Sequence, residues 1–169
     1  NNLFVCTKEG GMEEEDRRLL KLAGQFHLGE NANVFREGSL VLKNPSGAPP
    51  LVHKTILYGS STGAIGLIGC IEKPLFDLLL TLQEALARTV TSIGCIPHNV
   101  WRAFHNDRQK EPANGFIDGD LIERFLDLPR PEMNKICVDL FYDFDGTGMK
   151  REGTVDDLVK LIEDLARIH

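Results

Sequence analysis

The chain has 169 residues, of which 42% are hydrophobic and 26% charged, and its net charge is −6. This size allows one domain or two small ones, and the negative charge argues against a broad nucleic-acid surface while leaving room for a local basic patch. No apolar run is as long as a membrane span, and the chain begins at Asn1 without an initiator Met or a signal-peptide pattern, as a fragment or processed product would.

Four cysteines are spread along the chain and form no C-x-x-C pair: Cys6, Cys70, Cys95 and Cys137. Structural zinc sites and dense disulfide frameworks have closely spaced cysteines. We therefore expect free thiols in a reducing, intracellular setting, with no metal and no cofactor.

Residues 1–72 have the pattern of short strands separated by Gly, Pro and Asn. Apolar or alternating segments predict five strands, at residues 3–6, 22–28, 40–42, 55–58 and 64–68. The segment 59–63 between the last two predicts a hairpin turn, and 44–50 predicts a loop. Strands at this spacing favour antiparallel pairing and leave sheet edges that need cover.

From Lys73 onward the apolar residues recur at spacings of three and four, the period of a helix. Pro74 suits the first turn of a helix that reaches to about Ile93, before Gly94. Four further helices are predicted, which start at Pro97, after residue 115, near residue 133 and at residue 154. The fold class is therefore predicted as α+β, with strands in 1–72 and helices in 73–169.

Residues 115–126 form the most structured stretch of the helical part. Asp118 and Asp120 are candidate N-cap residues, and Asp120 with Glu123 resembles a capping box. Apolar residues in front of the cap are expected to pack back onto the new helix. Catalysis by the three carboxylates is the weaker alternative.

Residues 143–147 contain the motif most suggestive of chemistry, D-x-D-G-T. It resembles the nucleophile motif of haloacid-dehalogenase-type phosphatases, in which Asp143 would attack phosphorus and Asp145 would act as acid and base. Only one helix follows, which leaves no room for the other motifs of such an enzyme. The segment also matches the start of an EF-hand, but position twelve is Thr154, where a Glu is required. We therefore prefer a turn.

Five histidines are scattered along the chain, and two of them, His98 and His105, are separated by seven residues around Trp101. A metal pair on one helix has closer spacing or additional ligands. Partly exposed histidines without a metal are the preferred interpretation.

Several short segments, in their order and spacing, point to one family. They are residues 1–5, 26–30, 33–35, 38–41, 101–102, 104–105, 115–123, 149–152 and 167–169. The chain resembles the C-terminal end of the large adaptors in the family of the cleavage-and-polyadenylation-factor large subunits, in the branch of the damaged-DNA-binding complex. The resemblance implies a non-enzymatic scaffold of three β-propellers that links substrate receptors to a cullin RING ubiquitin ligase in DNA repair and ubiquitin-dependent proteolysis, in nucleus and cytoplasm.

The same resemblance implies where each part of the chain belongs. Residues 1–72 would be the final strands of a propeller, about its last blade, and residues 73–169 a C-terminal helical domain that braces the propellers. The partners would be receptor proteins and the remaining propellers of the adaptor. Cullin would bind only to parts outside this chain, and no direct nucleic-acid or membrane contact is expected.

Residues 29–35 would form part of the wall of the receptor cleft, with Asn33 and Val34 as the expected contacts, in a short turn or helix at the end of a strand. Asn31 and Ser61 stand where the family has an aromatic and an apolar residue. Polar groups there would weaken a groove for an amphipathic receptor helix and alter receptor choice. A sister scaffold in splicing or mRNA 3′-end processing is the alternative within the family, and the phosphotransferase is the alternative outside it.

Overall fold

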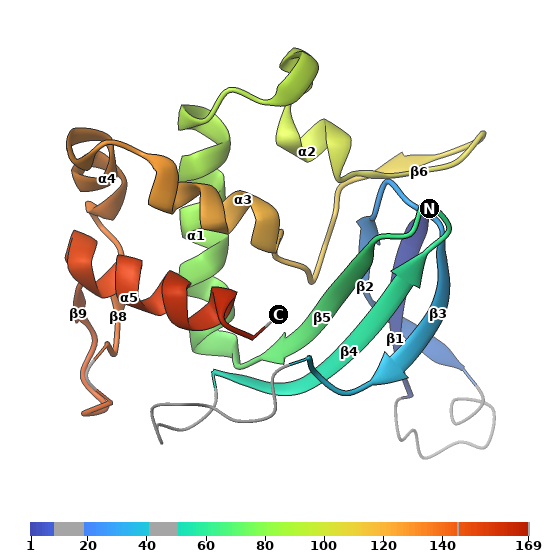
Figure 1. Ribbon diagram of the computed structural model, residues 1–169, viewed down its shortest axis with the longest axis horizontal. Coiled ribbons are helices and arrows are strands. Elements are labelled where there is room, and N and C mark those ends of the chain that lie inside the picture. Colours follow the sequence, from blue (N-terminus) through green and yellow to red (C-terminus); the bar gives the residue numbers. More distant parts are fainter. Residues whose placement is uncertain (9–18, 41–50, 145, 169) are drawn as a thin grey trace. The chain divides into compact units, whose positions relative to one another are not determined.

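A computed structural model describes residues 1–8, 19–40, 51–144 and 146–168 of the chain (Figure 1). The chain divides into two compact units, residues 1–31 with 92–116, and residues 32–91 with 117–169. We call them unit 1 and unit 2. The boundary expected near residue 72, between propeller strands and a helical domain, stays a prediction.

Unit 1 is built on one antiparallel hairpin, in which β1 (Asn2–Lys8) pairs with β2 (Leu20–His27). The later segment of the unit adds four short elements: η2 (Ile93–Cys95), α2 (His98–Trp101), β6 (Phe104–His105) and β7 (Lys110–Glu111). Gln25 of β2 and Asn114 exchange two backbone hydrogen bonds, of 2.8 and 2.9 Å. Gly115 follows at φ +71°, and a Cβ there would lie 2.8 Å from the carbonyl oxygen of Ala23, so the bridge requires a glycine.

The end of β2 is buried and polar. His27 is 6% exposed, its Nδ1 lies 3.0 Å from Oδ1 of Asn2, and its ring centroid lies 4.4 Å from that of His105. Burial lowers the pKa of His27 first, and the charges of His105 and Arg102 lower it further. The imidazole therefore prefers the neutral form in the folded chain.

The sheet of unit 2 has three antiparallel strands in the order β3-β4-β5. They are β3 (Ala32–Glu37), β4 (Val52–Ser60) and β5 (Ile65–Ile71). Their neighbours follow one another in sequence, so the sheet is a meander (Figure 1). The predicted hairpin at 55–68 is confirmed. The strand predicted at 40–42 is not confirmed at Leu40, which lies in a bend, and residues 41 and 42 are outside the described ranges.

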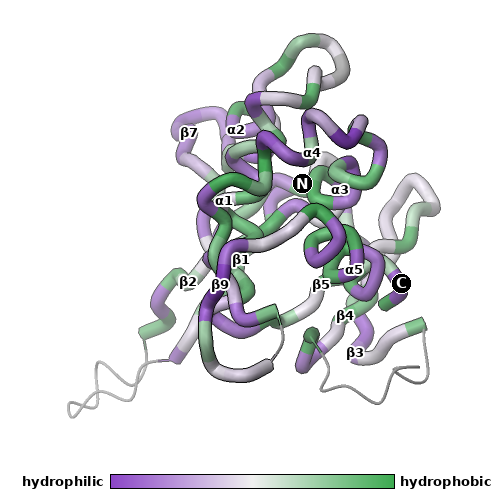
Figure 2. Tube along the Cα trace, turned by 90° about the vertical axis from the view of Figure 1, so that its left-hand side faces the viewer, coloured by the Kyte–Doolittle hydropathy of each residue, from purple (hydrophilic) through white to green (hydrophobic). Residues whose placement is uncertain are grey.

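The helices of unit 2 enclose an apolar core. They are α1 (Lys73–Thr89), α3 (Gly119–Glu123), η3 (Arg124–Asp127), α4 (Arg130–Cys137) and α5 (Val155–Ala166). Five side chains are less than 2% exposed: Leu82, Leu86, Phe125, Leu158 and Ile162. Hydrophobic and hydrophilic residues alternate along α5 in Figure 2, as expected of a helix with one buried face. The helical pattern predicted from residue 73 is therefore confirmed.

Two details of the helix starts and ends differ from the prediction. The helix from Lys73 ends at Thr89 rather than near Ile93, because the chain turns extended at Val90. The third helix has Asp118 at its N-cap, but the Asp118 side chain makes no cap hydrogen bond. The pairing of Asp120 with Glu123 as a capping box is wrong, since Asp120 already lies inside the helix.

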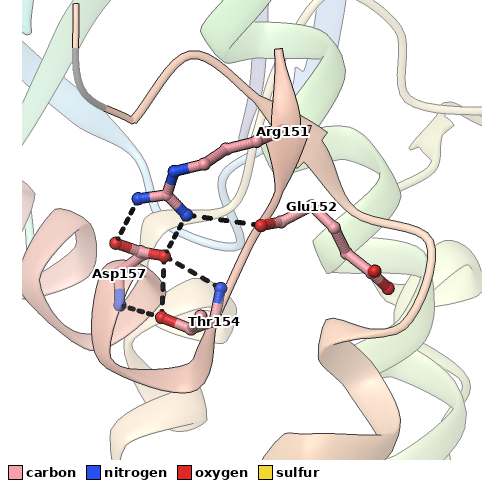
Figure 3. A network of polar contacts seen from close by, with 4 residues as sticks. All are labelled: Arg151, Glu152, Thr154 and Asp157. Carbon is pink, nitrogen blue, oxygen red and sulfur yellow. Dashed lines mark hydrogen bonds and ion pairs between the residues drawn. The ribbon is translucent and has the colours of Figure 1, made fainter.

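The start of α5 is held by a polar network (Figure 3). The helix start predicted at residue 154 is confirmed, and Thr154 and Asp157 form a capping box, in which each side chain accepts from the backbone N–H of the other residue. Arg151 donates to both carboxylate oxygens of Asp157, at 2.6 and 2.8 Å. The Arg151 guanidinium is the main reason that the pKa of Asp157 lies well below its ordinary value.

The described residues therefore form an α+β chain. A last short hairpin, β8 (Phe141–Tyr142) with β9 (Arg151–Glu152), connects α4 to α5. Among the described residues, no helix has the length and apolar character needed to cross a membrane.

Candidate functional site

The candidate receptor-binding residues of unit 2 lie at the hairpin end of the β3-β4-β5 sheet. The pairing of β3 with β4 shifts between Ala32↔Ser60 and Val34↔Gly59, so Asn33 is the extra residue of a β-bulge. Bulges twist a strand and redirect its side chains. The Asn33 side chain is exposed at this irregular point of the edge strand.

Val34 lies within strand β3, so the predicted turn or helix around this residue is wrong. After Val34 the strand continues, and Phe35, Arg36 and Glu37 each pair with a residue of β4. The Val34 side chain is 45% exposed. It is therefore accessible within the described chain.

Val34 of β3 pairs with Gly59 of β4, and Gly59 pairs in turn with Ile65 of β5. The three residues therefore form a row across the sheet. Cγ1 of Val34 lies 3.2 Å from the position that a Cβ on Gly59 would take. Ile65 is 69% exposed. We call Val34, Gly59 and Ile65 the apolar row. The Val34 side chain lies over the glycine at its centre, and Val34 and Ile65 both remain accessible.

The opposite face of the same sheet end is aromatic. The rings of Phe35 and Tyr58 are 6.2 Å apart between centroids, and Phe35 remains 45% exposed. The Tyr58 ring lies over Gly66 so closely that a Cβ there has no room. This packing fixes the strands beneath the apolar row.

The β4–β5 turn carries Ser61. Ser60 organises this turn, because its N–H donates to the carbonyl of Ala64 at 2.8 Å and its carbonyl accepts from Gly63 at 3.2 Å. Gly63 has φ +93°, in the left-handed region. Ser61 itself is exposed in the turn between β4 and β5.

The structure therefore brings Asn33, Val34 and Ser61 to one end of one sheet. Asn31 is exposed and is the last residue of unit 1, with which it is described. The sequence pattern did not identify Ile65 and Gly59 as site residues. The hairpin predicted around residues 59–63 was the signal that could have placed Gly59 opposite Ile65.

The D-x-D-G-T motif forms the connection between β8 and β9. The Asp143 carboxylate accepts hydrogen bonds from the backbone N–H groups of Thr147 and Gly148, at 3.0 and 2.7 Å. This is the turn-forming use of an Asp side chain. Asp145 lies outside the described residues, so the paired role considered for it is not tested. Within the described ranges, no group of three or more potential ligands is arranged for a metal ion.

Comparison with known proteins places these features in a family. Residues 1–127 match the family model described as the CPSF A subunit region. The chain is 41% identical to DNA damage-binding protein 1 of Drosophila melanogaster over 99% of its own length and 15% of that protein. It is 35% identical to DNA damage-binding protein 1b of Arabidopsis thaliana, over 99% of the chain and 14% of that protein. The chain thus spans about one seventh of the length of these relatives.

Proposed function

The chain belongs to the CPSF A subunit family, and on that premise we propose that it is part of a non-enzymatic adaptor that links substrate receptors to a cullin RING ubiquitin ligase in the response to DNA damage. The observation that carries the proposal is the 41% identity over 99% of the chain to DNA damage-binding protein 1 of D. melanogaster. The identity extends over strands and helices alike, which favours the damaged-DNA-binding branch over an mRNA-processing scaffold. The site of action expected for such an adaptor is the nucleus and cytoplasm.

In this proposal, β1 to β5 are the last strands of a propeller and residues 73–169 are the helical domain that follows it. The character of the β3-β4-β5 sheet supports this arrangement, because none of the residues in its three strands is buried within the described chain. Propeller blades are stacked on neighbouring blades, and a sheet taken from such a stack leaves half-covered faces. Cullin would bind elsewhere on the adaptor.

The receptor contact of the proposal uses Asn33 and Val34, with Asn31 and Ser61 as modifiers. The apolar row gives a receptor helix a place for an apolar side chain, and the bulge at Asn33 offers a polar group at its margin. Helix-in-groove recognition needs this combination of apolar anchors and a polar rim. Polar Asn31 and Ser61 would reduce affinity for receptors that rely on apolar anchors alone.

The experiment is Val34→Asp in the complete adaptor, measured for receptor binding and thermal melting together. The carboxylate would be desolvated against an apolar receptor helix, which is costly, so we expect binding to fall by at least about a hundredfold. The melt should be unchanged, because Val34 is 45% exposed in the free chain. Met149→Asp, at a 75% exposed position of the β8–β9 connection, is the matched control and should leave both measurements unchanged.

Each outcome has a separate meaning. Unchanged receptor binding in Val34→Asp would remove this residue from the site while leaving the adaptor proposal intact. A collapsed melt would show that Val34 packs inside the assembled scaffold. A complete unmodified adaptor that binds neither receptors nor cullin would contradict the proposed function itself.

A further inference from the structure

The helical part of unit 2 contains a surface that the proposed function does not use. A depression of about 360 Å³ lies between α1 and α4, which contact each other. We call it the α1–α4 groove and define it by six of its lining residues: Ala85, Arg88, Lys135, Ile136, Val138 and Leu140. Its size falls in the range of pockets that take small ligands or peptide side chains.

The floor of the groove is apolar and fixed. Ile136 and Leu140 belong to the apolar core and are 6% and 2% exposed, so the floor rests on packed side chains. Val138, just after the end of α4, is 60% exposed at the margin. An aliphatic side chain that entered the groove would bury apolar surface of its own and of Val138, and the floor beneath it would be the packed side chains of Ile136 and Leu140.

The rim of the groove is basic in a chain whose net charge is −6. Arg88 on α1 and Lys135 on α4 stand on opposite sides of the groove, and both are exposed. Within the described residues neither has an ion-pair partner. Asp139 is the one carboxylate among the lining residues, so cations outnumber anions at the rim.

The other polar groups of the rim distinguish between ligands. Thr81 and Thr89 donate their hydroxyl protons to the carbonyls of Asp77 and Ala85, both at 3.0 Å. Their oxygens therefore remain as acceptors, which suit a peptide N–H and not an anion. A free phosphate would contact only the two cationic side chains at the rim, because the described lining residues form no cradle of backbone N–H groups for it. A peptide would contact these cations and also the apolar floor and the hydroxyl acceptors.

We propose that the α1–α4 groove binds a linear peptide segment that carries an aliphatic side chain next to acidic residues. The aliphatic side chain enters between Ala85 and Ile136, and the flanking carboxylates pair with Arg88 and Lys135. The charge complementarity selects acidic partners and speeds their association. The proposal does not depend on receptor binding at the β3-β4-β5 sheet.

A peptide-display library of about twelve random residues, selected on the purified full chain, tests the specificity. The enriched peptides are expected to share an aliphatic residue flanked by Asp or Glu. The best of them, labelled with fluorescein, is then titrated with each variant by fluorescence anisotropy. Failure to enrich acidic-aliphatic peptides would overturn the proposal.

Four variants locate the binding. Charge reversal in the double variant Arg88→Glu/Lys135→Glu should weaken binding by at least about tenfold, and Val138→Ser by about two- to fivefold. Asp139→Asn should strengthen binding by about two- to threefold, because it removes the opposing charge. Lys160→Glu, at an exposed position of α5 outside the groove, is the control. It reverses one charge, as each half of the double variant does, and should change peptide affinity by less than about twofold.

Binding should also weaken with added salt, since the paired charges are exposed. Melting temperatures of all variants are measured alongside, and no large change is expected at these exposed positions. Equal binding by wild type and the double variant, or an Asp139→Asn variant that binds more weakly, would overturn the assignment of the site.

Discussion

The helices and the sheet of unit 2 differ in how they bury apolar residues. Among the described residues, the helical core contains fifteen that are buried, with Phe125 and Leu158 fully enclosed. The three strands of the β3-β4-β5 sheet contain none, and Val34 and Ile65 stand half or mostly exposed. Both regions carry many apolar residues in sequence, at strand spacing in one and helical spacing in the other. The helices bury their apolar residues within the chain, whereas the sheet leaves its apolar residues accessible for contact with another surface.

This difference separates two roles of apolar residues in one unit. In the helices they supply stability, because burial removes their surface from water. In the sheet they contribute little to the stability of the isolated chain and are available for contact with another surface. Truncation of an apolar side chain should therefore cost much more stability in the helices than in the sheet.

The largest expected effect is the loss of Phe125. Phe125→Ala removes a fully buried ring from the helical core and should lower the free energy of unfolding by about 3–5 kcal/mol. Ile65→Ala in the sheet, at a 69% exposed position, should cost less than about 1 kcal/mol. Urea denaturation followed by circular dichroism measures both. Equal losses would contradict the distinction between the two regions.

The next effect concerns the network at the start of α5. Asp157→Ala removes the capping box and the pair with Arg151 and should cost about 1–2 kcal/mol. Asp164→Ala, which removes an exposed contact with Arg167, is the control and should cost less than about 0.5 kcal/mol.

The contribution of Asp157 should also depend on pH. Because Arg151 lowers the pKa of the folded Asp157 carboxyl, the folded chain binds fewer protons than the unfolded chain in the acid range. The stabilisation is therefore present above about pH 4, the ordinary range of an Asp pKa, and is lost as pH falls further. The gap between wild type and Asp157→Ala should narrow in unfolding curves measured below that pH, and a constant gap would contradict the role of the ion pair.

A smaller effect is expected at the buried end of β2 in unit 1. Burial and the charge of His105 lower the pKa of His27, so protonation favours the unfolded chain. The contribution of His27 is present above about pH 6.5, the ordinary His pKa, and is lost as pH falls below it. His27→Gln should remove this part of the pH dependence of unfolding, while His53→Gln, at an exposed position, should keep it.

The smallest effect is expected in the β8–β9 connection. Asp143→Asn keeps an acceptor for Thr147 or Gly148, so the cost should be about 0.5 kcal/mol or less. A phosphatase assay with a divalent metal and a generic phosphate ester should give no rate for either protein. A rate that the substitution abolished would favour the phosphotransferase over the adaptor.

The helices could be predicted because their information is local. Spacings of three and four after Lys73 and the Thr154–Asp157 pair specify helices without reference to distant residues, and both are present. Strand β3 was missed because Asn33 interrupts its alternation at a bulge. A bulge depends on the partner strand, which the local pattern does not contain.

The candidate site was predictable only in part, for the same reason. Asn33, Val34 and Ser61 came from a family resemblance, and the structure brings them to one sheet end. Their neighbour Ile65 depends on the pairing of β4 with β5. The α1–α4 groove joins residues from two helices about fifty positions apart, and no spacing rule connects them.

The backbone bridge between Gln25 and Asn114 has a consequence for the newly synthesised chain. Side-chain contacts at this place join residues 86 positions apart, from Gln25 to Glu111. At a translation rate of about 5–20 residues per second, the β1–β2 hairpin leaves the ribosome roughly 4–17 s before its closing segment does. Throughout that interval the edge of β2 is an open template for another strand. Chaperone binding to nascent chains should therefore peak after β2 emerges and fall once residues 112–116 have cleared the exit tunnel.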